Sequence, residues 1–377
     1  MIVILEPDLP DRRAVVERVV AVARRFPGLE VRPYDFCGAE HTFTEVHLVG
    51  CTAQVPADAF DALPGVLRVV RVSARYRLIG RHDPAPRSVG FAVNGVRFDE
   101  RSVHLIAGLC AVDTRQHVEA TMAALAASGI VTARMGAYKP RTSPYDFQGL
   151  GSACLPWVLE LAGKYGIRLV AMEVTDARHI DEIDAALEAA GRPTAGMLQV
   201  GTRNAQNFEL LKQIGRRGEF PVLYKRGMGI TLEESLNACE YIASEGNSRI
   251  VFCLRGVKTH LGDPHRNLVD FAHVPVVRRQ TRLPVCVDPS HSVGSRAVAP
   301  DGIPDVVHAI GQGVVAGATA VLVDFHPRPE VALCDGGQAL RLEELPRLVA
   351  YVAAMRAAYG TAVSLFGEAS ALRSATA

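Results

Sequence analysis

The chain has 377 residues, of which 49% are hydrophobic and 21% charged, and this ordinary usage excludes collagen-like and disordered classes. The 41 lysines and arginines nearly balance the 40 aspartates and glutamates, so composition indicates no nucleic-acid or membrane-surface partner. No basic segment precedes an apolar one at the N-terminus, and no run approaches about 18 apolar residues, so we expect neither a signal peptide nor a membrane span. Eight scattered cysteines without Cys-x-x-Cys pairs indicate reduced thiols in a cytoplasmic protein.

Residues 1–75 show the element order of a small ferredoxin-like domain, which is strand, helix, strand, strand, helix, strand. The apolar patterns predict strands over 2–5, 29–31, 44–49 and 66–72, and helices over 10–25 and 57–63. Such domains bind small regulators, or they only pack and oligomerise, and the pattern alone leaves both open.

Residues 76–102 connect this domain to the rest of the chain. The segment 76–88 is polar and contains prolines, which is typical of a linker. Asn94-Gly95 lies between alternating residues and predicts a β-hairpin within 90–98.

From residue 103 to the end, apolar strand-like runs alternate with helical segments at a spacing of about 30 residues, the size of one βα unit. Eight strands are predicted, over 103–107, 130–133, 167–173, 196–200, 221–224, 250–253, 284–288 and 319–323. Eight parallel strands predict a (β/α)8 barrel over 103–377. A doubly wound sheet would instead place Gly-x-Gly-x-x-Gly after the first strand, where this chain has Ala107-Gly108-Leu109-Cys110.

A charged or reactive side chain follows every predicted barrel strand, at the end of the barrel where chemistry occurs. One group is cationic: Arg134, Lys139, Arg141, Arg203, Lys225 and Arg255. Because the net charge of the chain is only +1, so many cations at one rim predict polyanionic substrates, since arginine forks match phosphate and carboxylate groups. The alternative is that each is a solvated charge at a helix start.

A second group combines thiol, imidazole and carboxylate side chains: Cys110, His291, Asp324 and Asp335, with His326 nearby. Together they suit a divalent metal ion such as Mn, Fe, Co or Zn. Because these residues are dispersed in the sequence, the prediction depends on barrel closure, which makes the eighth strand a neighbour of the first. The alternative is a buried cysteine, a capping aspartate and a hydrogen-bonded histidine.

Several motifs resemble those of 3-deoxy-D-arabino-heptulosonate 7-phosphate (DAHP) synthases of the type I beta group. The most specific is Lys-Pro-Arg-Thr-Ser-Pro-Tyr over 139–145, and Gln-Val-Gly-Thr-Arg-Asn over 199–204 is similar to that family's strand-4 motif. Asp-Pro-Ser-His over 288–291 and Asp-Gly-Gly-Gln over 335–338 match as well. The resemblance covers nearly the whole chain, including the N-terminal domain.

The resemblance implies a transferase that joins phosphoenolpyruvate to erythrose 4-phosphate and releases phosphate, the first step of the shikimate route to aromatic amino acids. By motif, Arg134, Lys139, Arg203, Lys225 and Arg255 would hold phosphoenolpyruvate, while Arg141 and Thr142 would face the aldose phosphate. Cys110, His291, Asp324 and Asp335 would bind the metal.

Lys139, Cys110 and His291 are the residues we expect to take part in catalysis. Lys139 is the candidate proton donor to the nascent alkoxide, and we expect a neighbouring arginine to lower its pKa. Glu173 either positions the attacking water or simply pairs with an arginine.

Five features depart from the family pattern. Leu109 replaces a proline, Met135 a glycine and Leu254 a glutamate, and the segment 256–267 differs from the usual Gly-Ile-Arg-Thr-Phe-Glu run. Asp324 replaces a glutamate and is one methylene shorter, so the backbone moves inward, a water bridges, or His326 takes its place.

These departures keep alternatives open. A homologue in secondary metabolism would condense phosphoenolpyruvate with another aldehyde, and a non-catalytic homologue would only bind phosphoenolpyruvate. The allied synthase acting on arabinose 5-phosphate lacks both the Lys-Pro-Arg-Thr loop and the N-terminal domain.

The resemblance also implies a homotetramer and feedback inhibition by tyrosine or phenylalanine at the N-terminal domain. His41, Thr42 and Phe43 lie between its second and third strands, where an effector could bind between subunits. The plainer interpretation of these three residues is a turn followed by a core phenylalanine.

Overall fold

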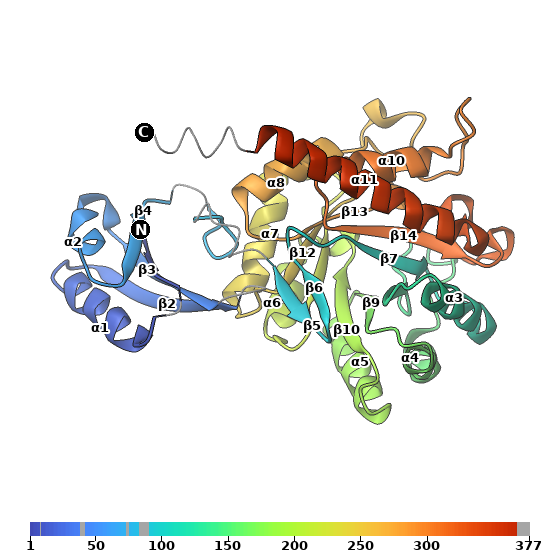
Figure 1. Ribbon diagram of the computed structural model, residues 1–377. Helices are drawn as coiled ribbons and strands as arrows, with labels where there is room; N and C mark the ends of the chain where they lie inside the picture. Colours follow the sequence, from blue (N-terminus) through green and yellow to red (C-terminus); the bar gives the residue numbers. More distant parts are fainter. Residues whose placement is uncertain (8, 38–41, 73–74, 83–89, 368–377) are drawn as a thin grey trace.

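A small N-terminal domain lies beside a larger barrel in the computed structural model, which describes residues 1–7, 9–37, 42–72, 75–82 and 90–367 (Figure 1). The N-terminal domain has a four-stranded antiparallel sheet in the order β2-β3-β1-β4. Its elements are β1 (Ile2–Leu5), α1 (Arg12–Ala23), β2 (Leu29–Cys37), β3 (Thr42–Gly50), α2 (Asp58–Asp61) and β4 (Val66–Val70). This order confirms the predicted ferredoxin-like domain.

The apolar spacing of the N-terminal elements accounts for their packing. Val15 and Val19 of α1 lie on one face of the helix and pack in the same buried cluster as Val3 and Leu48 of the sheet. The side chain of Asp11 accepts a hydrogen bond from the Ala14 backbone N–H and so begins the helix.

The barrel consists of eight parallel strands, as predicted. They are β7 (His104–Leu109), β8 (Thr132–Met135), β9 (Leu169–Val174), β10 (Ala195–Val200), β11 (Val222–Lys225), β12 (Ile250–Leu254), β13 (Val285–Val287) and β14 (Ala320–His326). Each strand pairs with its sequence neighbour, and β14 pairs with both β13 and β7, which closes the barrel. The short strand β15 (Leu340–Arg341) adds to β14 outside the ring.

Helices surround the strands, and a hairpin covers the base. The helices are α3 (Arg115–Ala127), α4 (Leu155–Lys164), α5 (Ala177–Ala189), α6 (Phe208–Gly215), α7 (Leu232–Ser244), α8 (Val274–Gln280), α9 (Pro289–Val293), α10 (Asp305–Val315) and α11 (Leu345–Phe366). The predicted hairpin is β5 (Phe91–Val93) and β6 (Val96–Phe98). Its Phe91 and Phe98 share a buried cluster with interior strand residues such as Ile106 and Leu322, so the hairpin closes the amino end of the barrel.

The last helix bears on the prediction that no run of about 18 apolar residues occurs in the chain. Within the described part of the chain, the segment Leu342–Phe366 is long and apolar enough to cross a membrane, judged by length and composition only. Leu345, Leu348 and Val352 of α11 are buried, and the helix runs beside α10 as the outer helix of the final βα unit (Figure 1). The rest of α11 is largely exposed.

Residues 76–82, within the predicted linker, bind to the barrel. Leu78 and Ile79 are buried in the same cluster as the barrel and its helices. The carboxylate of Glu240 on α7 accepts hydrogen bonds from the backbone N–H groups of Arg77, Leu78 and Ile79 at 2.6, 2.8 and 3.1 Å. This polar segment therefore follows a fixed path, because the Glu240 carboxylate satisfies three of its backbone N–H groups.

Arg282 of the barrel joins the two domains. Its guanidinium lies 4.2 Å from the ring centre of Phe36 and 5.1 Å from that of Phe43, and it donates to the buried Glu45 at 2.8 Å. Phe43 is thus a core residue of the domain junction, in line with the plainer interpretation of this turn. His41 lies outside the described residues, so the predicted effector site is not described as a whole.

Candidate active site

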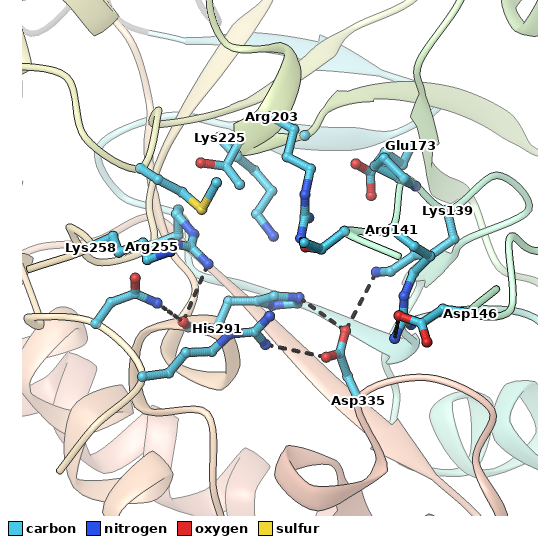
Figure 2. A pocket seen from close by; sticks show the side chains of 17 residues that line it. Lys139, Arg141, Asp146, Glu173, Arg203, Lys225, Arg255, Lys258, His291 and Asp335 are labelled. Atoms are coloured by element: carbon cyan, nitrogen blue, oxygen red, sulfur yellow. Dashed lines mark hydrogen bonds and ion pairs between the residues drawn. The ribbon is translucent and has the colours of Figure 1, made fainter. Parts of the chain in front are cut away.

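A cavity of about 720 Å³ opens at the carboxyl end of the barrel strands (Figure 2). Its lining includes five of the six predicted cations and the predicted threonine: Lys139, Arg141, Arg203, Lys225, Arg255 and Thr142. Lys258 and Arg266 add two more cations. The excess of positive charge suits ligands that carry phosphate or carboxylate groups.

Arg134 is the predicted cation that does not line the cavity. Its side chain is 2% exposed and pairs with Asp324 of β14, two strands away. Burial alone would lower the pKa of Arg134, but Asp324 and Cys110 raise it, so the guanidinium stays charged. Arg134 therefore contacts the predicted metal ligand Asp324 and does not border the cavity.

The four predicted metal ligands converge. One ligand atom from each of Cys110, His291, Asp324 and Asp335 lies within 4.8 Å of the others. The Cys110 Sγ lies 3.0 Å from Asp335 Oδ2 and 3.7 Å from His291 Nε2, and His291 Nε2 lies 3.6 Å from Asp335 Oδ2. Figure 2 shows His291 and Asp335 pointing toward each other at the cavity floor.

The chemistry of this set fits a divalent first-row metal ion. One thiol, one imidazole and two carboxylates are ligands that such ions accept, and three of the four residues are buried. Without a metal, burial raises the pKa of the Cys110 thiol well above its ordinary value. Asp335 has φ +53°, an uncommon backbone conformation for a residue other than glycine and one often found at functional sites.

Asp324 is held in place despite being shorter than the glutamate of the family pattern. One of its carboxylate oxygens accepts from Arg134, and the other accepts from Gln338 Nε2 at 2.6 Å. Its Oδ2 also lies 3.8 Å from His291 Nδ1. A pair of fixed donors thus orients this carboxylate within the cluster.

His326 does not take the place of Asp324 in the described structure. This was one of three ways in which we expected the chain to compensate for the shorter side chain of Asp324. Its Nε2 lies 2.9 Å from Asp113 Oδ2, while its Nδ1 accepts from the Arg328 backbone N–H at 3.0 Å. His117 Nδ1 contacts the same Asp113 carboxylate at 3.0 Å. This cluster ties the loop after β7 to the end of β14, next to Cys110 and Asp324.

Lys139 lies between the metal-ligand cluster and the cavity. Its Nζ is 2.7 Å from Cys110 Sγ and 3.7 Å from Asp335 Oδ2. Burial opposes its charge, but Cys110, Glu173 and Cys334 outweigh that effect and raise the pKa of Lys139. Arg134 acts in the expected direction and lowers the pKa of Lys139, but Cys110, Glu173 and Cys334 outweigh it, so the net pKa is raised.

Asp288 contacts two of the predicted site residues, and the sequence did not single it out. Its Oδ1 accepts from the His291 backbone N–H at 3.0 Å and lies 3.1 Å from His291 Nδ1, while its Oδ2 lies 2.6 Å from Lys225 Nζ. Burial would lower the pKa of His291, but Asp288 raises it to about 9. The carboxylate thus orients a predicted metal ligand and a cavity cation together, and its Asp-Pro start of a helix was the available signal.

Cys334 also lies at the site, although the sequence did not single it out. Its thiol lies 3.2 Å from Asp335 Oδ2 and accepts from Arg141 Nη1 at 2.7 Å. Cys110 and Lys139 lower the pKa of Cys334. Adjacency to Asp335 in the sequence was the only signal for it.

Glu173 faces the cavity from β9 and is 7% exposed. Gln199, its register partner on β10, donates to it at 3.3 Å. A Cβ added at Gly201 would lie 1.8 Å from Glu173 Oε1, so only glycine at this position leaves the carboxylate its place. Neither described contact is an ion pair with an arginine.

Three departures from the family pattern lie away from the cavity. Leu109 and Met135 are register partners on β7 and β8, and both are fully buried. Leu254 belongs to the same cluster, between the strands and the surrounding helices. These residues pack the outer core and do not line the cavity.

Comparison with known proteins agrees with this geometry. The sequence model of the DAHP synthetase I family matches residues 93–359. The chain belongs to the DAHP synthetase I family. A Thermotoga maritima phospho-2-dehydro-3-deoxyheptonate aldolase is 37% identical over 97% of this chain and 100% of its own length. A crystal structure of DAHP synthase from Thermotoga maritima matches with a TM-score of 0.69 and 35% identity, over 95% of this chain and 98% of that one.

Relatives with a different product name match less of this DAHP synthetase family member. A 2-dehydro-3-deoxyphosphooctonate aldolase from Syntrophotalea carbinolica is 29% identical over 65% of this chain and 87% of its own length. The Thermotoga maritima relatives match along the N-terminal domain as well as the barrel.

Proposed function

We propose that this protein condenses phosphoenolpyruvate with erythrose 4-phosphate in a metal-dependent reaction that yields DAHP and phosphate. The observation that carries the proposal is one cavity in which seven cationic side chains surround a thiol, imidazole and carboxylate cluster. Two phosphorylated substrates and a divalent ion require this combination. Membership of the DAHP synthetase I family supports the choice of reaction.

Lys225, Arg203 and Arg255 are the proposed binding residues for phosphoenolpyruvate, together with Lys139. Arg255 is 2% exposed, and its Nε is buried without a hydrogen-bond partner among the described residues. A bound anion would satisfy that N–H group. Lys225 is already oriented by Asp288, so it adds a fixed positive charge to the same part of the cavity.

Arg141 and Thr142 are the proposed binding residues for the phosphate of the aldose. Arg203 Nη2 donates to Thr142 Oγ1 at 3.0 Å, and this contact supports neighbouring subsites for the two substrates. Arg266, held by Asp335 Oδ1 at 3.2 Å, lies at the same rim. Binding both substrates in this way converts their encounter into a step within one complex.

Cys110, His291, Asp324 and Asp335 would hold the divalent ion, which when bound supplies Lewis-acid polarisation of the aldehyde carbonyl. The new bond forms between the methylene carbon of phosphoenolpyruvate and the aldehyde carbon, and the carbonyl oxygen becomes an alkoxide. Lys139 Nζ donates the proton that this oxygen takes up, directly or through a water. Its position beside Cys110 and Asp335 supports that role.

Glu173 positions the water in the second half of the reaction. The carbon that bears phosphate becomes electron-deficient when the first bond forms, and a water oxygen adds to it. Glu173 Oε1 and Oε2 are the carboxylate acceptors on the cavity wall next to Gly201, and they can orient that water. The resulting hemiketal phosphate expels inorganic phosphate and leaves the keto product.

Phosphate release tests the proposal. Purified protein is incubated with phosphoenolpyruvate, a divalent metal and a panel of aldehydes that includes erythrose 4-phosphate and arabinose 5-phosphate. We expect the fastest release with erythrose 4-phosphate. Faster turnover of another aldehyde would replace the acceptor, and no release with any acceptor and metal would overturn the catalytic function.

A further inference from the structure

A second cavity, of about 590 Å³, lies where the N-terminal domain meets the base of the barrel. Its lining includes four arginines, one glutamate and one tyrosine: Arg68, Arg81, Arg278, Arg279, Glu100 and Tyr359. Arg68 belongs to β4, Arg278 and Arg279 end α8, and Tyr359 belongs to α11. Glu100 precedes β7 and α8 precedes β13, so this cavity lies at the amino ends of the strands, opposite the catalytic cavity.

The lining has more positive than negative charge. Glu100 accepts from Arg81 Nη2 at 2.5 Å and lies 3.5 Å from Arg278 Nη2, so one carboxylate serves two guanidinium groups. Arg68 and Arg279 have no carboxylate within 4.0 Å among the described residues. They come from different domains and border the same space. Two guanidinium groups that have no counter-ion within the described part of the chain therefore border the cavity.

Buried hydrogen-bond donors without a partner also support an anion site in this cavity. Arg68 Nε and Arg278 Nε are buried and have no hydrogen-bond partner in the described part of the chain. Buried polar groups are normally hydrogen-bonded, so each such atom needs an explanation. Arg255 Nε in the catalytic cavity shows the same feature. In the second cavity these unsatisfied donors belong to two side chains, Arg68 and Arg278, that border the same space.

Arg278 is fixed before any ligand arrives. Its guanidinium lies 5.4 Å from the ring centre of Tyr359, and its Nη1 donates to the Tyr359 hydroxyl and to the Gly317 carbonyl. A planar fork held in this way loses little freedom when it binds a phosphate or carboxylate.

We propose that this cavity binds a small organic polyanion that carries a phosphate group or paired carboxylates. The anion contacts Arg68 from the N-terminal domain and Arg278 and Arg279 from the barrel. This function goes beyond the condensation reaction, because the cavity lies at the other end of the barrel. A ligand that bridges β4 and α8 also links the position of the N-terminal domain to that of the barrel.

Calorimetric titration with pyrophosphate tests this site. The wild-type chain is compared with Arg68→Gln, Arg279→Gln and Arg255→Gln, and with Arg24→Gln, an exposed arginine outside both cavities. We expect two binding sites in the wild-type chain and in Arg24→Gln. Arg68→Gln and Arg279→Gln should weaken one site at least tenfold, and Arg255→Gln should weaken the other.

Three results would overturn the proposal. They are a single pyrophosphate site in the wild-type chain, unchanged affinities in both Arg68→Gln and Arg279→Gln, or a change of oligomer mass in Arg279→Gln by light scattering with unchanged affinity. The last result would assign the cavity to a subunit contact. Arg279 is exposed, so its substitution tests the site even where Arg68→Gln fails to fold.

Discussion

Lys139 Nζ lies 2.7 Å from Cys110 Sγ, so a buried ammonium group touches the thiol of the predicted metal site. The loop 139–145 follows β8 and Cys110 follows β7, and the pairing of these two strands brings them together. Lys139 also lines the cavity. The same side chain can therefore stabilise a thiolate and reach the substrate.

Replacing Lys139 with methionine tests its role in proton transfer. General acid catalysis contributes about 10²–10⁴-fold, so we expect kcat for phosphate release to fall by that factor. Lys212→Met is the matched control, because Lys212 lies outside the cavity and pairs with the exposed Glu209 on α6. Wild-type kcat in Lys139→Met would contradict the assigned role.

The metal-ligand cluster predicts that divalent ions stabilise the folded chain. A ligand that binds only the folded state at 100 times its Kd adds about 2.7 kcal/mol. We expect Zn²⁺ or Mn²⁺ to raise the Tm of the wild-type chain and of Cys51→Ala, whose cysteine is exposed and outside the cluster. The same ions should leave the Tm of Cys110→Ala nearly unchanged. An equal Tm rise in Cys110→Ala would remove Cys110 from the ligand set.

The sequence predicts the barrel and most of the cavity because the signals are local. Strand runs, helix starts and the residues that follow each strand are read within a few positions, and closure of the barrel then brings Cys110 to Asp324 and Asp335. Lys258 and Arg266 were missed because they lie in a long loop after β12, where no periodic pattern fixes their direction.

Contacts between distant residues could not be predicted in this way. Arg134 pairs with Asp324, 190 positions away, and does not line the cavity. Glu240 fixes the backbone of 77–79 from α7, more than 160 positions away, so a segment with linker composition follows a defined path. Hydropathy and spacing say which residues are buried, but they do not say which buried charges face each other.

Gly201 and Glu173 provide a test that separates activity from stability. A methyl group at position 201 displaces the Glu173 carboxylate, which is the far end of a flexible side chain, so we expect a small change in stability. We also expect kcat to fall about tenfold or more, as it should in Glu173→Gln, because the water loses its orientation. Gly218→Ala, where the added Cβ meets open space, is the control. Full activity of Gly201→Ala would show that Glu173 has only a structural role.

The Glu45–Arg282 pair predicts a pH-dependent contribution to stability at the domain junction. Burial would raise the pKa of Glu45, but Arg282 and His47 outweigh it and the net pKa is lowered. Because the folded pKa lies below the unfolded value of about 4.3, the contribution is complete above that pH and is lost as the pH falls through the folded pKa. Glu45→Gln leaves a buried guanidinium without its counter-ion and should cost about 3–5 kcal/mol in urea unfolding at pH 7, with a smaller difference from the wild-type chain below pH of about 4. Glu30→Gln, which alters an exposed pair with Arg32, should match the wild-type chain at both pH values. A wild-type advantage over Glu45→Gln that is equal at both pH values would contradict the electrostatic origin of this contribution.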